Sequence, residues 1–285
     1  MLKDKKILIV GLGLIGGSYA QSLKRQGIHV GALSRSSDTI SYALEQGLID
    51  EGTAEVTPEF VGAYDLIVFA LYPHVLLDWI RRYQAYIRPG AILTDVTGVK
   101  CAVVYDIQQM LRPDIEFIGA HPMAGREVYG VRNADCSIFR GANYIVTPTD
   151  ANTPGAIALC EELGRTLGFA QVVRLTPEKH DEMIGFLSQL THCIAIALMT
   201  CKDTGYMSQY TGDSFRDLTR IARINEEMWP ELFLLNKNEL LDQIDVFSEQ
   251  MDRLREAIAT GNTEELKQMM RLSTERRTVF DKKEQ

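Results

Sequence analysis

The sequence predicts an α/β protein in which a doubly wound, mostly parallel sheet domain precedes an all-α domain. Short apolar runs alternate with amphipathic helical patterns along the N-terminal part of the chain. A glycine-rich turn joins the first apolar run to the first helical pattern. Beyond Thr176 helical periodicity continues without a convincing strand. We therefore expect a sheet domain over residues 1–175 and a helical domain over residues 176–285.

The glycine-rich turn follows the apolar run 6–10 and opens the helical pattern 18–26, and a second apolar run at 28–33 completes a β-α-β unit. Its glycines have G-x-G-x-x-G spacing, which permits a tight turn, close approach of a pyrophosphate and close helix–strand packing. The helix N-terminus favours phosphate groups. This pattern is typical of a Rossmann-type dinucleotide site. The residues expected to line it are Gly11, Gly13, Leu14, Ile15 and Gly16.

The end of the second strand distinguishes NAD from NADP. NAD enzymes usually carry an acidic residue there that binds the ribose 2′-hydroxyl. This chain has Ser34, Arg35 and Ser36 instead, with no carboxylate before Asp38. A guanidinium binds phosphate as a planar fork, so an arginine flanked by hydroxyls suits the 2′-phosphate of NADP. We expect NADP rather than NAD, bound by these three residues.

Further strands and helices alternate along the chain, as in a doubly wound sheet. Ligands of such sheets lie beyond the carboxyl ends of the strands, so Tyr72, Thr97 and His121 should line the same edge as Gly11. We expect Tyr72 and Thr97 to contact the cofactor. The expected strands are 65–71, 91–94, 117–120, 143–147 and 171–175, and the expected helices are 39–47, 75–86, 101–111, 153–167 and 177–200.

Composition restricts the partners. The net charge of −8 argues against nucleic acid or an anionic membrane as partner. Five scattered cysteines lack the spacing of metal ligands, so we expect reduced thiols and no metal. The N-terminus lacks a signal-peptide pattern, and the longest apolar stretch, 193–199, is too short to span a bilayer. These features predict a cytoplasmic protein.

Two histidines are candidates for chemistry. His121 follows a predicted strand and can exchange a proton with a hydroxyl as hydride leaves the same carbon, although a structural histidine fits equally well. His192 shares the one polar face of its helix with Ser188 and Gln189. A core histidine is the alternative there.

Arginines mark a later helix. Arg216, Arg220 and Arg223 recur at i, i+4 and i+7 behind a Ser214–Asp217 pattern that resembles a capping box. Such a face is usually solvated, but in an acidic protein it suits a carboxylate substrate.

Several segments together resemble the prephenate and arogenate dehydrogenases of tyrosine biosynthesis. They are GLGLIGGS, DVTGVK, HPMAGRE, the pair His180–Asp181, LSQLTH and SFRDLTRIA, in the same order and over essentially the whole chain. The resemblance implies a Rossmann domain joined to a helical domain that forms a homodimer. It also implies oxidative decarboxylation of prephenate, a small dicarboxylate, to 4-hydroxyphenylpyruvate with hydride transfer to NADP.

The resemblance also implies roles for single residues. His121 matches the histidine that hydrogen-bonds the ring hydroxyl, and Arg220 matches the arginine that binds a substrate carboxylate. Gly98 stands where the family usually has serine, and Thr97 is the candidate to supply the missing hydroxyl. Glu127 matches an acidic position near the substrate side chain, and Arg216 a basic residue that reaches the neighbouring subunit's site. The substrate-binding candidates are therefore Arg220, His192, Glu127, Gln189 and Arg216.

Three alternatives stay open. Arogenate differs from prephenate by an ammonium group, which Glu127 would attract and Arg126 would oppose. An NADP-dependent β-hydroxyacid dehydrogenase or imine reductase would use a lysine on the long helix, where this chain has only Lys179 in the first turn. A redox sensor that binds NADP without turnover would leave His121 and Arg220 without a role.

Overall fold

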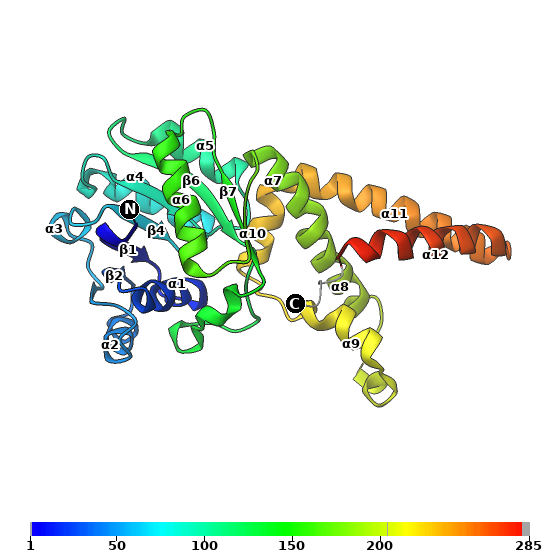
Figure 1. Ribbon diagram of the computed structural model, residues 1–285. Coiled ribbons are helices and arrows are strands. Elements are labelled where there is room, and N and C mark those ends of the chain that lie inside the picture. Colours follow the sequence, from blue (N-terminus) through cyan, green and yellow to red (C-terminus); the bar gives the residue numbers. More distant parts are fainter. Residues whose placement is uncertain (1, 204, 281–285) are drawn as a thin grey trace. The chain divides into compact units, whose positions relative to one another are not determined.

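The computed structural model describes residues 2–203 and 205–280, so residues 1, 204 and 281–285 of the two predicted domains lie outside the described residues. One compact unit ends at Lys237 and a second begins at Asn238. The first contains an eight-stranded sheet (Figure 1). The strands are β1 (Ile7–Val10), β2 (Val30–Leu33), β3 (Glu51–Thr53), β4 (Leu66–Phe69), β5 (Ile92–Asp95), β6 (Glu116–Pro122), β7 (Asn143–Thr147) and β8 (Gln171–Arg174).

The sheet has the strand order β3-β2-β1-β4-β5-β6-β7-β8. Neighbouring strands are parallel except for β6 and β7, which pair antiparallel. The predicted doubly wound, mostly parallel sheet is therefore confirmed. β3 was not predicted, because its sequence Glu-Gly-Thr contains no apolar residue that would mark a buried strand.

Helices flank the sheet, and the described residues after β8 form helices and turns only. Thr153 and Thr176 begin two of the helices by accepting hydrogen bonds from Ala156 N and Lys179 N, each with proline at the first helical position. The helices are α1 (Leu14–Arg25), α2 (Ser37–Glu45), α3 (Pro58–Val61), α4 (Pro73–Tyr83), α5 (Cys101–Met110), α6 (Pro154–Leu167), α7 (Pro177–Ile184), the π-helical η5 (Gly185–Leu190), α8 (Thr191–Thr200), α9 (Asp213–Thr219), the short 3₁₀ turn η7 (Arg220–Ala222), α10 (Met228–Leu235), α11 (Lys237–Ala259) and α12 (Thr263–Arg277).

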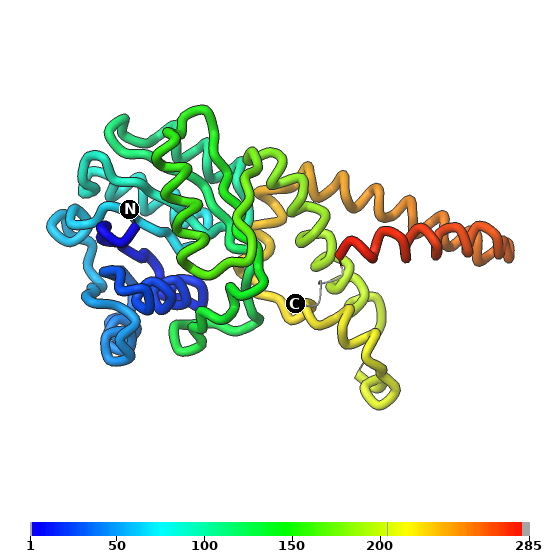
Figure 2. Tube along the Cα trace, in the orientation of Figure 1, coloured from blue at the N-terminus to red at the C-terminus, as the bar shows by residue number. Residues whose placement is uncertain are grey.

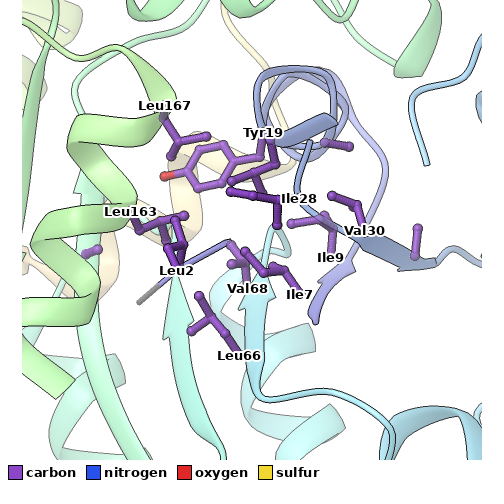
Figure 3. Close-up of a cluster of buried hydrophobic side chains, with 14 of the residues drawn as sticks. Leu2, Ile7, Ile9, Tyr19, Ile28, Val30, Leu66, Val68, Leu163 and Leu167 are labelled. Atoms are coloured by element: carbon purple, nitrogen blue, oxygen red, sulfur yellow. The ribbon is translucent and has the colours of Figure 1, made fainter. Parts of the chain in front are cut away.

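Two hydrophobic cores lie on the two faces of the sheet. On one face, Tyr19 of α1 and Leu163 of α6 pack over strands β1, β2 and β4 (Figure 3). On the other face, α4 and α5 cover the sheet with Trp79 and Val104, among others. Leu232 of α10 joins this second core. The burial of both faces explains why the central strands are continuous apolar runs.

The helices between β8 and Lys237 leave the sheet along α7, η5 and α8 and return to it at α10 (Figure 2). The helix 177–200 extends over 24 residues, and its most apolar window has a mean hydropathy of 1.6, so length and composition would allow it to cross a membrane. The uninterrupted apolar run 193–199, which we expected to be too short to span a bilayer, lies within this longer helix. Core helices of globular proteins share these properties.

The second unit contains most of α11 and all of α12. Gly261, with φ +67°, ends the turn between the two helices, and Arg253 forms an ion pair with Glu265. Several apolar side chains on this unit are exposed: Val246, Met251, Ile258, Met270 and Leu272. Exposed apolar side chains that lie together often mark a surface that binds another protein chain.

Candidate active site

The carboxyl ends of four adjacent parallel strands form the site. Gly11 directly follows β1, Tyr72 lies beyond β4, Gly98 lies beyond β5, and His121 is the penultimate residue of β6. Because β1, β4, β5 and β6 are neighbours in parallel register, these residues share one edge of the sheet.

The glycine turn fits a dinucleotide. A Cβ on Gly11 would lie 2.4 Å from the Ala70 carbonyl oxygen, and one on Gly16 would lie 1.9 Å from the Gly11 carbonyl oxygen. A Cβ on Gly13 would meet nothing within 4 Å, and Gly13 precedes α1 without a side-chain cap, so no side chain caps the first N–H groups of α1. A pyrophosphate fits this cradle, since backbone N–H groups and the helix dipole both favour it.

The far end of this cradle lies after β2. The Ser34 N–H donates to the Thr53 carbonyl, and the Ser36 hydroxyl accepts from Thr39 N at 3.3 Å and so caps α2. Arg35 between them is exposed. The Ser36 hydroxyl is therefore used inside the fold, whereas the Arg35 guanidinium is accessible to an anion.

His121 is the first member of a chain of three hydrogen-bonded side chains. Its Nδ1 lies 2.9 Å from Nε2 of His180, whose Nδ1 lies 2.7 Å from Oδ1 of Asp181. The Asp181 carboxylate also accepts from the backbone N–H groups of Lys100 and Cys101, both at 2.8 Å. Burial lowers the pKa of His121 well below its usual value, and the nearby His180 and Lys100 act in the same direction. His121 is therefore neutral at pH 7.

A buried ion pair holds the strand ends that carry this histidine. Lys100 Nζ donates to Asp95 Oδ2 and to the Ala120 carbonyl, both at 2.6 Å, and Asp95 Oδ1 accepts from Ala120 N at 3.0 Å. Both side chains are fully buried. Ala120 directly precedes His121, so the pair connects β5 to the position of the histidine on β6.

The hydroxyl of Thr97 is part of this network. It lies against the Asp95 carboxylate, 2.9 Å from the Val99 carbonyl and 3.2 Å from Lys100 Nζ. The Thr97 hydroxyl is therefore engaged within the fold, and its predicted catalytic and cofactor-binding roles stay predictions.

Gly98 leaves space beside His121. A Cβ at this position would lie 3.8 Å from Nε2 of His121 and 3.5 Å from Cδ1 of Leu232, which are ordinary van der Waals contacts. The glycine is thus not required by packing, and Nε2 of His121 makes no hydrogen bond to another described residue.

The predicted substrate residues come from three distant segments. Arg220 of η7 forms an ion pair with Glu127 at 2.6 Å across 93 positions of the sequence. His192 stacks on Trp229 of α10 with ring centroids 3.7 Å apart, and its Nδ1 lies 2.8 Å from the Ser188 carbonyl. Burial lowers the pKa of His192, which Glu127 raises and Arg220 lowers, so the three side chains share one environment.

Other expectations for this part of the chain were wrong. The helix α9 ends at Thr219, so the three arginines do not form one continuous helical face. Gly212 precedes α9 without a side-chain cap, which excludes the capping box at Ser214. Arg216 is exposed and pairs with Asp213.

Gln189 is buried and used inside the fold. Its Nε2 donates to the Leu232 carbonyl at 3.0 Å, and its Oε1 accepts from Asn236 at 2.7 Å. The amide ties η5 to α10, and both ends of it are engaged.

Sequence reasoning gave no role to His180 or Trp229. His180 belongs to a segment that the motifs include, but its contact with His121 spans 59 positions. Within residues 2–203 and 205–280, no group of three or more His, Cys, Asp or Glu side chains is arranged to hold a metal ion.

Comparison with known proteins gives a consistent result. Residues 19–182 match the family model for the nucleotide-binding domain of prephenate dehydrogenase, and residues 176–272 match the model for its dimerization domain. Prephenate dehydrogenase of Bacillus subtilis (strain 168) is 29% identical over 272 residues, which cover 93% of this chain and 73% of that protein.

Two solved structures of dehydrogenases are similar to this chain over almost its whole length. A prephenate dehydrogenase from A. aeolicus, crystallised with hydroxyphenyl propionate and NAD+, has a TM-score of 0.88 and 30% identity over 97% of this chain and 98% of that chain. Arogenate dehydrogenase of Synechocystis has a TM-score of 0.83 and 27% identity over 97% of this chain and 100% of that chain.

Proposed function

The chain belongs to the prephenate dehydrogenase family, and we propose that it catalyses the oxidative decarboxylation of prephenate to 4-hydroxyphenylpyruvate. It is an oxidoreductase with a nicotinamide cofactor. The position of His121 is the observation that best supports this reaction. The histidine is neutral, and its Nε2 lies beside Gly98 at the carboxyl edge of the sheet.

The chemistry follows from this geometry. The bound nicotinamide supplies the acceptor for the hydride on the hydroxyl-bearing ring carbon. His121 Nε2 accepts the hydroxyl proton, so the oxygen becomes a ketone and the ring a dienone. The ring carboxylate then leaves as carbon dioxide, its bonding electrons aromatise the ring, and His121 returns the proton to the phenol oxygen. Protons and electrons balance without a metal ion.

We assign NADP as the preferred cofactor because Arg35 is exposed where an acidic residue would bind the NAD ribose. Arg35→Ala should raise the KM for NADP by about 10- to 100-fold, which is the loss of a charge-assisted hydrogen bond to the 2′-phosphate. The KM for NAD should stay within about threefold, because NAD lacks that phosphate. Initial rates with both nucleotides measure this, and equal losses for the two would contradict the assignment.

Arg220 is assigned to a substrate carboxylate, with Glu127 and His192 beside it. In the structure its Nη1 donates to Oε1 of Glu127 at 2.6 Å, and this contact with a carboxylate supports the assignment. Arg220→Ala should raise the KM for prephenate about 10- to 100-fold and change kcat by less than about fivefold. Arg165→Ala is the matched control, since Arg165 is also exposed and paired with a glutamate. An unchanged KM in Arg220→Ala would remove this role.

The active form is assigned as a cytoplasmic homodimer that associates through the helical domain, residues 176–285, while residues 1–175 bind NADP. The exposed apolar side chains of α11 and α12 support this assignment, as does the match to a dimerization domain. Under this assignment the exposed Arg216, which pairs with Asp213 and the Thr211 carbonyl in its own chain, approaches the neighbouring subunit's site. Neither a nucleic acid nor a membrane is a partner in this proposal.

Arogenate is the second candidate substrate. Arg126, which would oppose its ammonium group, pairs with Asp135, whereas Glu127, which would attract it, is engaged by Arg220. The β-hydroxyacid dehydrogenase alternative requires a catalytic lysine on the long helix. The candidate, Lys179, is exposed on the first turn of α7 and pairs with Glu182, which argues against this alternative.

The test of the function is the initial rate of nucleotide reduction, followed at 340 nm, with prephenate and arogenate each crossed with NADP and NAD. We expect the highest kcat/KM with prephenate and NADP. A faster reaction with arogenate would reverse the substrate assignment. The absence of turnover in all four combinations, with NADP binding intact, would favour the NADP sensor.

A further inference from the structure

His180 is a buried histidine that the reaction itself does not use. Its side chain is fully buried. One ring nitrogen contacts His121 and the other contacts Asp181. We propose that His180 is a positioning residue that fixes the tautomer of His121, so that Nε2 of His121 carries the lone pair that accepts the substrate proton. This inference rests on the proposed function, which supplies the substrate proton.

The direction of each hydrogen bond follows from Asp181. Burial acts to raise the pKa of Asp181, but hydrogen bonds from His180 and from the backbone of Cys101 and Lys100 outweigh it and hold the pKa below its usual value. The ionised carboxylate can only accept, so His180 Nδ1 must carry a proton. Burial also lowers the pKa of His180, so the ring is neutral and its Nε2 is an acceptor.

The same reasoning extends one residue further. An acceptor at His180 Nε2 requires a proton on His121 Nδ1, 2.9 Å away. Since His121 is neutral, its Nε2 then carries a lone pair. This nitrogen lies 3.8 Å from the position of a Cβ on Gly98 and makes no hydrogen bond to another described residue. The carboxylate thus determines, through two rings, which nitrogen of His121 is basic.

The charges around His180 act in both directions, and burial is the largest influence on its pKa, which it lowers. The ionisable groups that act on it are Asp181, Lys100, Asp95 and His121. Lys100 opposes a positive charge on His180, while Asp181 and Asp95 favour it. When His121 gains a proton at Nε2, its Nδ1–H becomes a stronger donor to His180, and the carboxylate of Asp181 at the end of the chain stabilises the new charge.

A histidine with a merely structural role would predict a different pattern. Such a residue could have either donors or acceptors as its hydrogen-bond partners. Its loss would lower the stability of the protein and change kcat, KM and cofactor affinity together. Here the partners are an obligate acceptor on one side and the catalytic base on the other. The expected signature is therefore a change in kcat and in the protonation pattern of His121, with little change in substrate or NADP binding.

Two substitutions separate these cases. His180→Leu removes the acceptor and retains the apolar volume, and we expect kcat to fall by roughly 10²- to 10⁴-fold, as when a general base is lost or held in the wrong tautomer. The KM for prephenate and the Kd for NADP should stay within about threefold. His180→Gln places an amide oxygen near the position of Nε2, so it should retain kcat within about tenfold of the original enzyme.

The tautomer is measured directly by ¹⁵N NMR of the imidazole nitrogens in histidine-labelled protein. The chain has five histidines, and single substitutions assign them. In the unmodified enzyme His121 should be protonated at Nδ1 and unprotonated at Nε2, and in His180→Leu this pattern should reverse. Protonation of His121 at Nε2 in the unmodified enzyme would overturn the proposal, whether or not the leucine variant folds.

The rates provide the second criterion. Full activity of folded His180→Leu would also overturn the proposal, as would a loss in His180→Gln as large as in His180→Leu despite an intact fold. A failure of the proposed function is recognised separately, because the unmodified enzyme would then turn over neither prephenate nor arogenate while its histidine spectrum still reports the tautomers.

Discussion

His121→Asn is expected to lower kcat by roughly 10²- to 10⁴-fold, the usual contribution of a positioned general base. An asparagine amide has no basic nitrogen, so the hydroxyl proton must leave to water while hydride is transferred. The Kd for NADP should remain nearly unchanged, because the pyrophosphate cradle at Gly11 and Gly13 is formed by a separate turn. Steady-state kinetics and nucleotide titration by fluorescence measure the two quantities.

A matched control is His29→Asn, which removes a histidine that pairs with Glu51 outside the site. It should leave kcat within about twofold.

The pH dependence adds a further check. Because burial lowers the pKa of His121, the base stays unprotonated through pH 6.5, and kcat/KM should decline only well below that value. Normal turnover in His121→Asn would show that another group accepts the proton.

The sheet was predictable because its signals are local. Strands such as β1 and β4 are buried apolar runs, and the glycine turn marks the first β-α-β unit. The exception, β3, is a three-residue edge strand with intermediate burial. Its pairing depends on β2 being in place and not on its own composition.

The site was predictable only where a single residue carries the signal. His121 follows a strand and could be proposed from its place on the sheet. The pairing of Arg220 with Glu127 and the contact of His121 with His180 join distant segments, so no spacing rule indicates them. The sequence also did not reveal that the polar groups of Thr97 and Gln189 are engaged by backbone and side-chain partners, and the roles predicted for these two residues stay predictions.

The position of His121 itself depends on a buried ion pair, and this leads to a large expected effect on stability. Lys100 and Asp95 are both fully buried. Lys100→Met would leave the Asp95 carboxylate without its charge partner and the Ala120 carbonyl without one donor. Breaking a buried pair on one side costs about 3–5 kcal/mol, because the remaining charge stays in a low-dielectric interior.

Urea denaturation followed by tryptophan fluorescence measures this loss. The two tryptophans, Trp79 and Trp229, both belong to the compact unit that also contains Lys100, so the signal reports the relevant transition. Lys179→Met is the matched control, since it removes a lysine from an exposed pair with Glu182 and should change the free energy of unfolding by less than about 1 kcal/mol. If both variants lost equally little, Lys100 would not be a buried partner of Asp95. A large loss in Lys100→Met alone would show that the ion pair which connects β5 to β6 stabilises the strand ends that carry His121.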